Sequence, residues 1–272
     1  MGGRLENPGG FGVAGVSSRE KMPAMTELKH LRAEDAHTDS STAAARFSPA
    51  PEIRDFMPAD MEAFVTAYDE VWGWEIHADP ASMERSTMAL AYTLTNLLRA
   101  DAARTALLPD GRPGALACMR WDASNPQTHG VEPAHRDLAR IRMKTLYERC
   151  VSRLAATNLG RDCLEFEDDL MAVNHELMGR LPPVPEGGRA ELIYLITVRE
   201  ARGLGLGKAL MDDFEAACRT RGIGDAFLYT DNHCHWKIYL KRGWSIAAKK
   251  RWRAPIEDDA IESMLMRKAM QP

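Results

Sequence analysis

The sequence predicts an α+β fold, sandwich-like, in which helices flank one central sheet. Three observations carry this prediction. Short runs of strand length recur along the chain, and segments of helical periodicity separate them. Asp110-Gly111 lies between two apolar runs, which is a strong hairpin signal. The apolar, β-prone run 192–198 leads into a glycine-rich turn and then into an amphipathic helix.

Length and composition are those of an ordinary soluble globular protein. The chain has 272 residues, of which 45% are hydrophobic and 27% charged, and its net charge is −4. This charge argues against nucleic acid or an anionic membrane as the main partner. The cysteines show no C-x-x-C spacing, and we find neither a signal peptide nor an apolar run of about 18 residues. We therefore expect a cytoplasmic protein.

The first 50 residues differ in composition from the rest. Glycines crowd the first 15 positions, and a Ser/Thr/Ala-rich run follows at 37–45. Such a segment buries too little apolar surface to offset the entropy of ordering it. We expect residues 1–50 to be a disordered extension and 51–272 to form the folded domain. Met22 and Met25 offer an alternative start of translation.

The folded part is expected to begin with a strand, two helices and a hairpin. Alternation over 52–56 predicts the strand, and Asp60 begins the first helix. A second helix is expected over 80–99, with one apolar side formed by Met83, Leu90, Leu94, Leu97 and Leu98. Strands 104–108 and 114–121 flank the Asp-Gly turn.

A helical insertion is expected at about 133–187. One helix, over 135–156, is basic on one face and apolar on the other, with Leu138, Ile141, Leu146, Cys150, Val151 and Leu154. The next, over 164–178, carries the acids Glu165, Glu167, Asp168, Asp169 and Glu176. Two interpretations stay open. In the first, the opposite charges of the two helices pair or face solvent. In the second, the insertion forms a wall of an acceptor site, and the carboxylates of the insertion attract a cationic amine.

The remaining elements follow the glycine turn. A helix with Leu210, Met211, Phe214, Ala217 and Cys218 on one face is expected to end at Gly222. A strand over 225–230, a short helix over 236–242 and two antiparallel strands over 244–252 and 263–268 complete the chain.

The glycine turn indicates an anion cradle, because backbone N–H groups and a helix N-terminus converge there. Two common nucleotide motifs fail on spacing. The dinucleotide pattern G-x-G-x-x-G finds Lys208 or Leu210 where it needs its third glycine. The P-loop pattern finds Arg202 where it needs its first glycine, and Ala209 where it needs Ser or Thr.

A different pattern fits. The stretch Arg202-Gly203-Leu204-Gly205-Leu206-Gly207, followed by Asn232, Tyr239 and Gly243-Trp244, resembles the signatures of the GNAT superfamily of N-acetyltransferases. The resemblance covers about 52–121 and 189–268. It implies a mixed, mostly antiparallel sheet and acetyl-CoA as co-substrate. It also implies cofactor contacts from Ile196, Thr197, Val198, Arg202, Gly203, Leu204, Gly205, Leu206, Gly207, Lys208, Asn232 and Tyr239.

The same resemblance suggests the catalytic groups. Tyr239 matches the tyrosine that protonates the departing thiolate, although it is also suited to packing. Glu191 matches a glutamate that accepts the amine's proton in some members, although it also suits an exposed strand end. By strand alternation Glu191 shares a face with Ile193, Leu195 and Thr197. His233 and His235 are the other candidate bases, since histidine titrates near neutrality.

The functional hypothesis is acetyl transfer from acetyl-CoA to a primary amine by direct attack in a ternary complex. The acceptor is an amine-bearing small molecule or peptide, and Trp72 and Trp74 are expected to wall its site. A homodimer is one option for assembly. We expect no metal site. A nucleophilic Cys234 is a further alternative, as is a non-catalytic module that binds or senses acyl-CoA.

Overall fold

The computed structural model describes residues 50–73, 82–121, 138–253 and 260–270. They belong to the compact unit Pro49–Pro272. The expected disordered extension falls outside the described residues except for residue 50. In the described part of the chain, no helix combines the length and apolar character needed to cross a bilayer.

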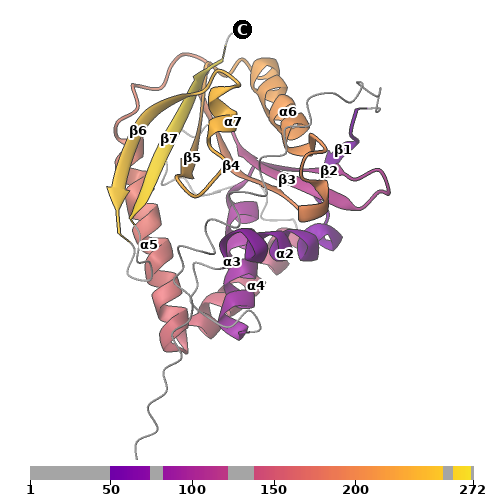
Figure 1. The fold of residues 1–272 in the computed structure, drawn as a ribbon, viewed down its shortest axis with the longest axis vertical. Coiled ribbons are helices and arrows are strands. Elements are labelled where there is room, and N and C mark those ends of the chain that lie inside the picture. Colours follow the sequence, from indigo (N-terminus) through magenta and orange to yellow (C-terminus); the bar gives the residue numbers. More distant parts are fainter. Residues whose placement is uncertain (1–49, 74–81, 122–137, 254–259, 271–272) are drawn as a thin grey trace, which may run out of the picture. The chain divides into compact units, whose positions relative to one another are not determined.

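One mixed sheet organises this unit (Figure 1). Its seven strands, in sheet order, are β1 (Ile53–Asp55), β2 (Ala102–Leu107), β3 (Pro113–Arg120), β4 (Arg189–Thr197), β5 (Asp225–Asp231), β7 (Ile261–Ala269) and β6 (Ser245–Trp252). Every neighbouring pair is antiparallel except β4 and β5, which are parallel. The predicted α+β fold with a mostly antiparallel sheet is confirmed.

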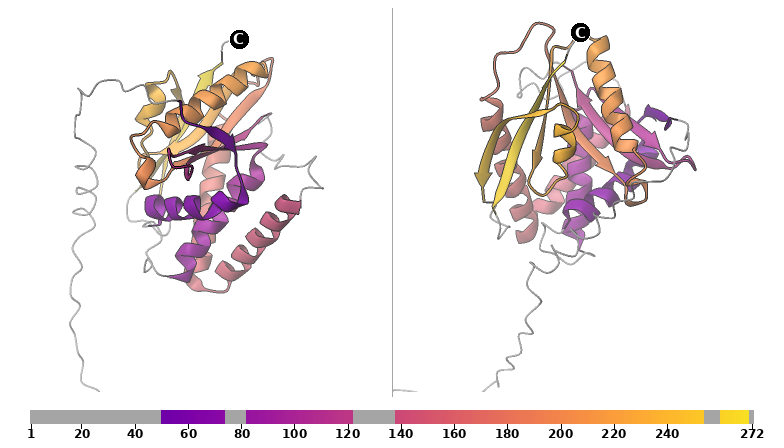
Figure 2. Two further views of the ribbon diagram at one scale, coloured as in Figure 1. Left: turned by 90° about the vertical axis from the view of Figure 1, so that its right-hand side faces the viewer. Right: turned by 45° about the horizontal axis from the view of Figure 1, so that its top comes forward.

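Helices cover both faces of the sheet (Figures 1 and 2). One side carries α2 (Met61–Trp72), α3 (Met83–Arg99), α4 (Leu138–Ala155) and α5 (Asn158–Met178). The other side carries α6 (Leu206–Thr220) and the short α7 (Lys237–Leu240). Two 3-10 turns, η1 (Pro58–Asp60) and η2 (Arg199–Ala201), precede α2 and the glycine turn.

The insertion forms two helices as predicted, with two corrections. Helix α5 begins at Asn158 rather than at 164, because the Thr157 hydroxyl accepts a hydrogen bond from the Gly160 amide and caps it. The predicted apolar face of α4 is wrong in its N-terminal half, where Leu138 is 68% and Ile141 49% exposed. Its buried residues are Cys150 and Leu154, which pack with α3 and α5.

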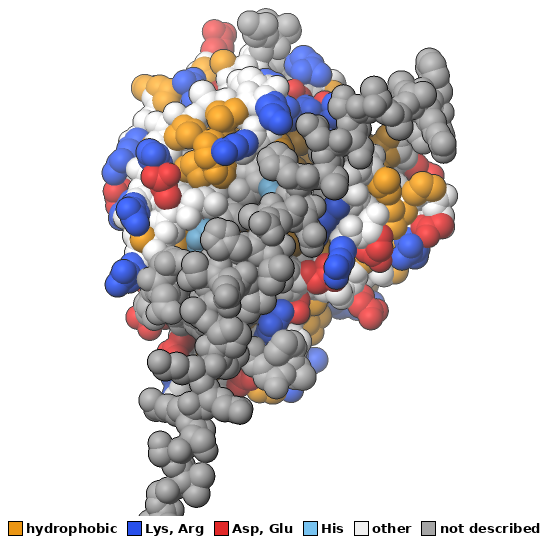
Figure 3. Space-filling model, viewed as in Figure 1, with side chains coloured by type: hydrophobic (Ala, Val, Ile, Leu, Met, Phe, Trp, Pro, Cys, Tyr) orange, Lys and Arg blue, Asp and Glu red, His pale blue; other side chains and the backbone are white. Residues whose placement is uncertain are grey.

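The core packs against both faces of the sheet. Phe64 of α2, Leu116 of β3 and Phe214 of α6 are fully buried in its largest cluster. On the described surface seen in Figure 3, basic and acidic side chains are interspersed. That face therefore presents no broad field of one sign to a polyanion such as nucleic acid.

The parallel strands diverge, and this divergence positions the site. Residues 189–191 of β4 pair with 225–227 of β5, and the pairing stops there, while each strand continues to pair with its other neighbour. The closed end is held by Asp225, which is fully buried and accepts hydrogen bonds from Arg189 and Arg267 at 2.8 Å each. Beyond it, the edge of β4 faces the divergence rather than a paired strand.

Candidate active site

Along β4, the backbone N–H and C=O groups of successive residues point alternately toward β3 and toward the side where β5 diverges. The Val198 amide donates to the Gly114 carbonyl oxygen on the β3 side, at 2.9 Å. Antiparallel pairing then directs the N–H and C=O groups of Thr197 and Leu195 to the opposite side, toward β5. Of the strand residues predicted to bind the cofactor, Thr197 turns its backbone to the divergence, whereas Ile196 and Val198 turn theirs to β3. Sequence reasoning missed Leu195 in this role.

A β-bulge decides which way Glu191 faces. The register between β3 and β4 shifts at Ile193, which becomes an extra residue on β4. The predicted alternation, with Glu191 on the face of Ile193, Leu195 and Thr197, is therefore wrong. Glu191 points to α3, as does Tyr194, whose ring contacts an aromatic ring of that helix. Thr197 lies on the other side, against the start of α6.

The glycine turn leaves an open cradle of backbone donors. Gly203 and Gly205 have φ of +82° and +80°, which non-glycine side chains rarely adopt. A Cβ at either position would meet no atom within 4 Å, so space within the protein does not demand glycine there. Gly205 caps α6 without a side-chain hydrogen bond, and the amides of 206–208 have no acceptor within the helix. This arrangement fits the pyrophosphate of acetyl-CoA.

The two cations beside the cradle hold only surface partners. The Arg202 guanidinium lies 3.8 Å from the Glu70 carboxylate, and Lys208 lies 2.9 Å from Asp212. Exposed pairs of this kind contribute about 0–1 kcal/mol. Both side chains can therefore exchange these partners for a phosphate at little cost.

Tyr239 lies on α7, on the same side of the sheet as the glycine turn. Its half-buried ring packs edge-on against Trp244, with ring centroids 6.2 Å apart. Burial, together with the nearby Cys234 and Asp231, raises the pKa of the Tyr239 phenol above its usual value. The hydroxyl therefore stays protonated at neutral pH and is available as a proton donor.

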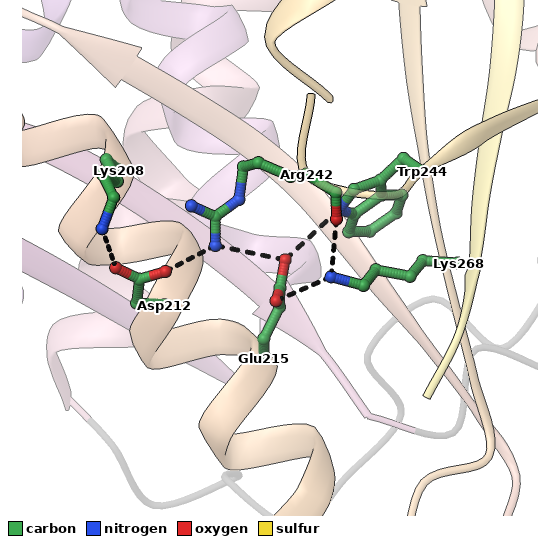
Figure 4. A network of polar contacts seen from close by, with 6 residues as sticks. All are labelled: Lys208, Asp212, Glu215, Arg242, Trp244 and Lys268. Atoms are coloured by element: carbon green, nitrogen blue, oxygen red, sulfur yellow. Dashed lines mark hydrogen bonds and ion pairs between the residues drawn. The ribbon is translucent and has the colours of Figure 1, made fainter. Parts of the chain in front are cut away.

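A network of ion pairs fastens α7 to α6 (Figure 4). Arg242, just after α7, contacts Asp212 at 2.6 Å and Glu215 at 3.3 Å. Glu215 also accepts hydrogen bonds from the Trp244 indole at 3.3 Å and from Lys268 at 2.9 Å. The helix that carries Tyr239 is thus tied to the helix that begins at the glycine turn.

Asn232, a predicted cofactor contact, already has a structural bond. Its side-chain oxygen accepts a hydrogen bond from the Glu262 amide at 2.7 Å. This contact joins the end of β5 to the start of β7, so only its NH₂ group is left to donate to a ligand.

The structure argues against a nucleophilic Cys234. Burial and the neighbouring Asp231 raise the pKa of its thiol, so the reactive thiolate is disfavoured. Asp231 accepts hydrogen bonds from the amides of His233 and Cys234, which holds this segment as a turn. His235 is exposed. Among the described residues, no group of His, Cys, Asp and Glu side chains could hold a metal ion.

Glu191 is buried between two arginines. It is 2% exposed, and its carboxylate oxygens lie 2.7 Å from Arg120 of β3 and 3.3 Å from Arg99 of α3. Trp72, a predicted wall of the acceptor site, packs on the same side of the sheet against Tyr194. Trp74, the other predicted wall, lies outside the described residues.

Residues 164–244 match the sequence profile of the acetyltransferase (GNAT) family. This match supports a place in the GNAT superfamily for that segment of the chain. The matched residues run from α5 to Trp244 and include both the glycine turn and the stretch with Asn232 and Tyr239. No curated protein sequence matches the chain.

Several solved structures also align with this chain. Ard1 from Thermoplasma volcanium is 13% identical, with a TM-score of 0.44 over 82% of this chain and 100% of its own. A histone acetyltransferase HPA2 and related acetyltransferase from Corynebacterium glutamicum is 14% identical, with a TM-score of 0.47 over 82% and 98%. A GNAT superfamily phosphinothricin acetyltransferase from Sinorhizobium meliloti, in complex with AcCoA, is 14% identical, with a TM-score of 0.45 over 82% and 89%.

Proposed function

We propose that this chain transfers an acetyl group from acetyl-CoA to a primary amine by direct attack within a ternary complex. One observation carries the proposal: β4 and β5 diverge beside the uncapped N-terminus of α6 in a GNAT domain. The amides of the glycine turn, with Arg202 and Lys208, would bind the pyrophosphate. The backbone groups of Leu195 and Thr197 would hold the amide-bearing arm of the cofactor along β4.

The reaction needs a neutral amine, a stabilised oxyanion and a protonated leaving group. The amine nitrogen bonds to the thioester carbonyl carbon, and the carbon–sulfur bond breaks. Tyr239 gives its proton to the departing sulfur. A β4 amide facing the divergence donates to the carbonyl oxygen as charge develops. Glu191 is the proposed proton acceptor; because Arg99 and Arg120 engage both its oxygens, it would act through a water molecule.

The alternative is a module that binds acyl-CoA without turnover. It would need the glycine turn but not Tyr239, whose helix is tethered through Arg242 to the helix that follows that turn. The two functions differ in whether thiol is released from acetyl-CoA when amines are supplied.

The test measures thiol release from acetyl-CoA over a panel of amines, with the wild type and Tyr239→Phe. We expect turnover by the wild type and a fall in kcat of about 100-fold in the variant, the usual contribution of a general acid, with an unchanged Kd for acetyl-CoA. Tyr147→Phe, on α4, is the matched control and should keep full activity. Binding of acetyl-CoA without turnover of any amine would favour the non-catalytic module, and equal kcat in Tyr239→Phe would remove Tyr239 from the mechanism.

A further inference from the structure

A set of buried and half-buried polar side chains lies where β4 and β5 begin to diverge, on the side of α3 and α5. We call it the vertex cluster: Arg99 of α3, Arg120 of β3, Glu191 of β4, and Glu167 and Asn174 of α5. Arg99 and Arg120 both pair with Glu191, and the charge of Arg99 also acts on Glu167. Tyr229 of β5, close to Glu191, donates its hydroxyl to the Asn174 carbonyl oxygen at 3.0 Å. The cluster thus joins both diverging strands to the insertion.

This cluster holds most of the unsatisfied polar atoms in the described residues. Eight buried side-chain nitrogen or oxygen atoms there have no hydrogen bond, and six belong to the vertex cluster. One of the six, Glu191 Oε2, is ion-paired with Arg120 at 2.7 Å. The five without a partner are Arg99 Nε, Arg120 Nε and Nη1, Glu167 Oε1 and Asn174 Oδ1. An unpaired buried group costs about 1–3 kcal/mol. Natural folds keep such groups where water or a ligand completes them.

The charges of the cluster do not balance. Burial, aided by Asp168 and opposed by Arg99, raises the pKa of Glu167 to about 8. Glu167 is therefore mostly neutral at pH 7, and Cys163, one turn earlier, is a neutral thiol. Two guanidinium charges less the one Glu191 carboxylate leave a net charge of +1. A buried charge without a counterion is unfavourable, so the cluster is suited to an anionic group.

The unsatisfied atoms are divided between donors and acceptors. Three are guanidinium nitrogens of Arg99 and Arg120, which suit the oxygens of a carboxylate. Glu167 Oε1 and Asn174 Oδ1, both on α5, suit an amine. A ligand that carries only positive charge, such as a polyamine, would be repelled by the net charge of the cluster. A molecule with an amine and a carboxylate matches both sets.

We propose that the acceptor is an amino acid, bound by the vertex cluster through its carboxylate to Arg99 and Arg120 and through its amine to Glu167 and Asn174. This inference rests on the proposed acetyl transfer and names its substrate class. It assigns the inward face of α5, rather than the exposed acids of that helix, to recognition of the acceptor.

The experiment compares amino acids with their carboxamides, which keep the amine and lose the carboxylate. Thiol release from acetyl-CoA gives kcat/KM for each of the standard amino acids and its amide. The wild type should prefer amino acids by about 10- to 100-fold, the range of a charge-assisted hydrogen bond. Arg120→Met should lower that preference to near unity, and Arg120→Lys should retain part of it. Arg161→Met, at an exposed arginine of α5, is the matched control and should keep the preference.

A second variant covers the case in which Arg120→Met does not fold. Asn174→Leu removes an unpartnered buried oxygen, so its Tm should be equal or higher, while its KM for amino acids should rise several-fold. The thermal shift of the free protein is an independent readout. At ten times Kd, an amino acid should raise Tm by about 3–6 °C, and its amide should not.

The outcomes separate the two proposals. If acetyl-CoA neither binds nor turns over while amino acids still raise Tm through Arg120, the acetyl transfer is wrong and the site stands. If amides or polyamines react as well as amino acids, the acetyl transfer stands and the amino-acid site is wrong. If neither amino acids nor amides react or raise Tm, the cluster holds water only and the inference is overturned.

Discussion

The charged clusters on the two sides of the sheet differ in how completely their members are paired. On the α6 side, Lys208, Asp212, Arg242, Glu215 and Lys268 form a continuous network in which each charge has an opposite partner (Figure 4). Of the buried side-chain atoms in that network, Arg242 Nε lacks a hydrogen bond. On the α3 and α5 side, the vertex cluster pairs two arginines with one carboxylate and leaves five other buried atoms without a partner.

This difference shows which side of the sheet has its ion pairs and hydrogen bonds complete without a ligand. A satisfied polar network fixes the geometry of the elements it joins, here the helix of Tyr239 and the helix after the glycine turn. Buried polar atoms without hydrogen bonds lower the stability of the fold, and proteins keep such atoms at functional sites. The elements that carry the proposed cofactor site are therefore preformed on the α6 side, and the vertex cluster has the properties of a binding site for a charged acceptor.

The largest effect should come from breaking the satisfied network. Glu215→Gln removes the carboxylate shared by Arg242, Lys268 and the Trp244 indole. Loss of one partner of a buried ion pair costs about 3–5 kcal/mol, so urea denaturation should show a loss of that size. Glu262→Gln, in an exposed pair with Lys249, is the control and should change stability by less than about 1 kcal/mol.

The difference in stability between the wild type and Glu215→Gln should also depend on pH. Burial alone would raise the pKa of Glu215, but the hydrogen bond from Lys268 and the charge of Arg242 hold it below the usual value of 4.5. An acid whose pKa is lowered by folding stabilises the protein above its unfolded pKa and loses that stabilisation as pH falls. The difference in stability between wild type and Glu215→Gln should therefore shrink below about pH 4.5. A constant difference down to pH 3 would contradict this assignment.

A smaller loss of stability is expected when the vertex cluster is changed. Glu191→Gln leaves Arg99 and Arg120 without their carboxylate, but Glu191 Oε2 already lacks a well-directed hydrogen bond. We expect a loss of about 2 kcal/mol, within the range for hydrogen bonds to charged groups, measured by urea denaturation. A loss as large as that of Glu215→Gln would show that the two sides are equally well satisfied.

The last effect should have the opposite sign. The carboxyl of Glu167 has a pKa raised to about 8, so the folded state binds a proton that the unfolded state releases above about pH 4.5. Stability should therefore fall as pH rises from about 4.5 to 8, and Glu167→Gln should remove this fall. Above pH 8, where the wild-type carboxyl is ionised, the variant should be the more stable of the two. Glu165→Gln, at an exposed acid of the same helix, is the control and should leave the slope unchanged.

Local patterns predicted the elements that lie close together in the sequence. The glycine turn, the following helix and the short helix with Tyr239 are encoded by spacing, so the cofactor side could be assembled from residues 192–244 alone. The hairpin around Asp110-Gly111 and the two insertion helices were also predicted, with shifted ends. The exposed N-terminal half of α4 was missed, because the apolar spacing does not say which residues find a neighbouring helix.

The acceptor side could not be predicted in the same way. Arg99, Arg120, Glu167 and Glu191 come from four elements and meet only through long-range packing. The bulge at Ile193, which turns Glu191 toward α3, has no sequence signal as clear as a glycine. A buried acid amid exposed acids, such as Glu167 on α5, is also indistinguishable from its neighbours until the helix is packed.

Titration of acetyl-CoA into the wild type, Gly205→Asn and Asn174→Leu tests the division between the two sides most directly. Asparagine tolerates positive φ, and its Cβ would meet no protein atom within 4 Å, so the fold should be kept while the cradle is filled. The account predicts binding by the wild type and by Asn174→Leu with the same Kd, and weaker binding by Gly205→Asn of about 10-fold or more. No binding by the wild type, or equal Kd values for the wild type and Gly205→Asn, would contradict it.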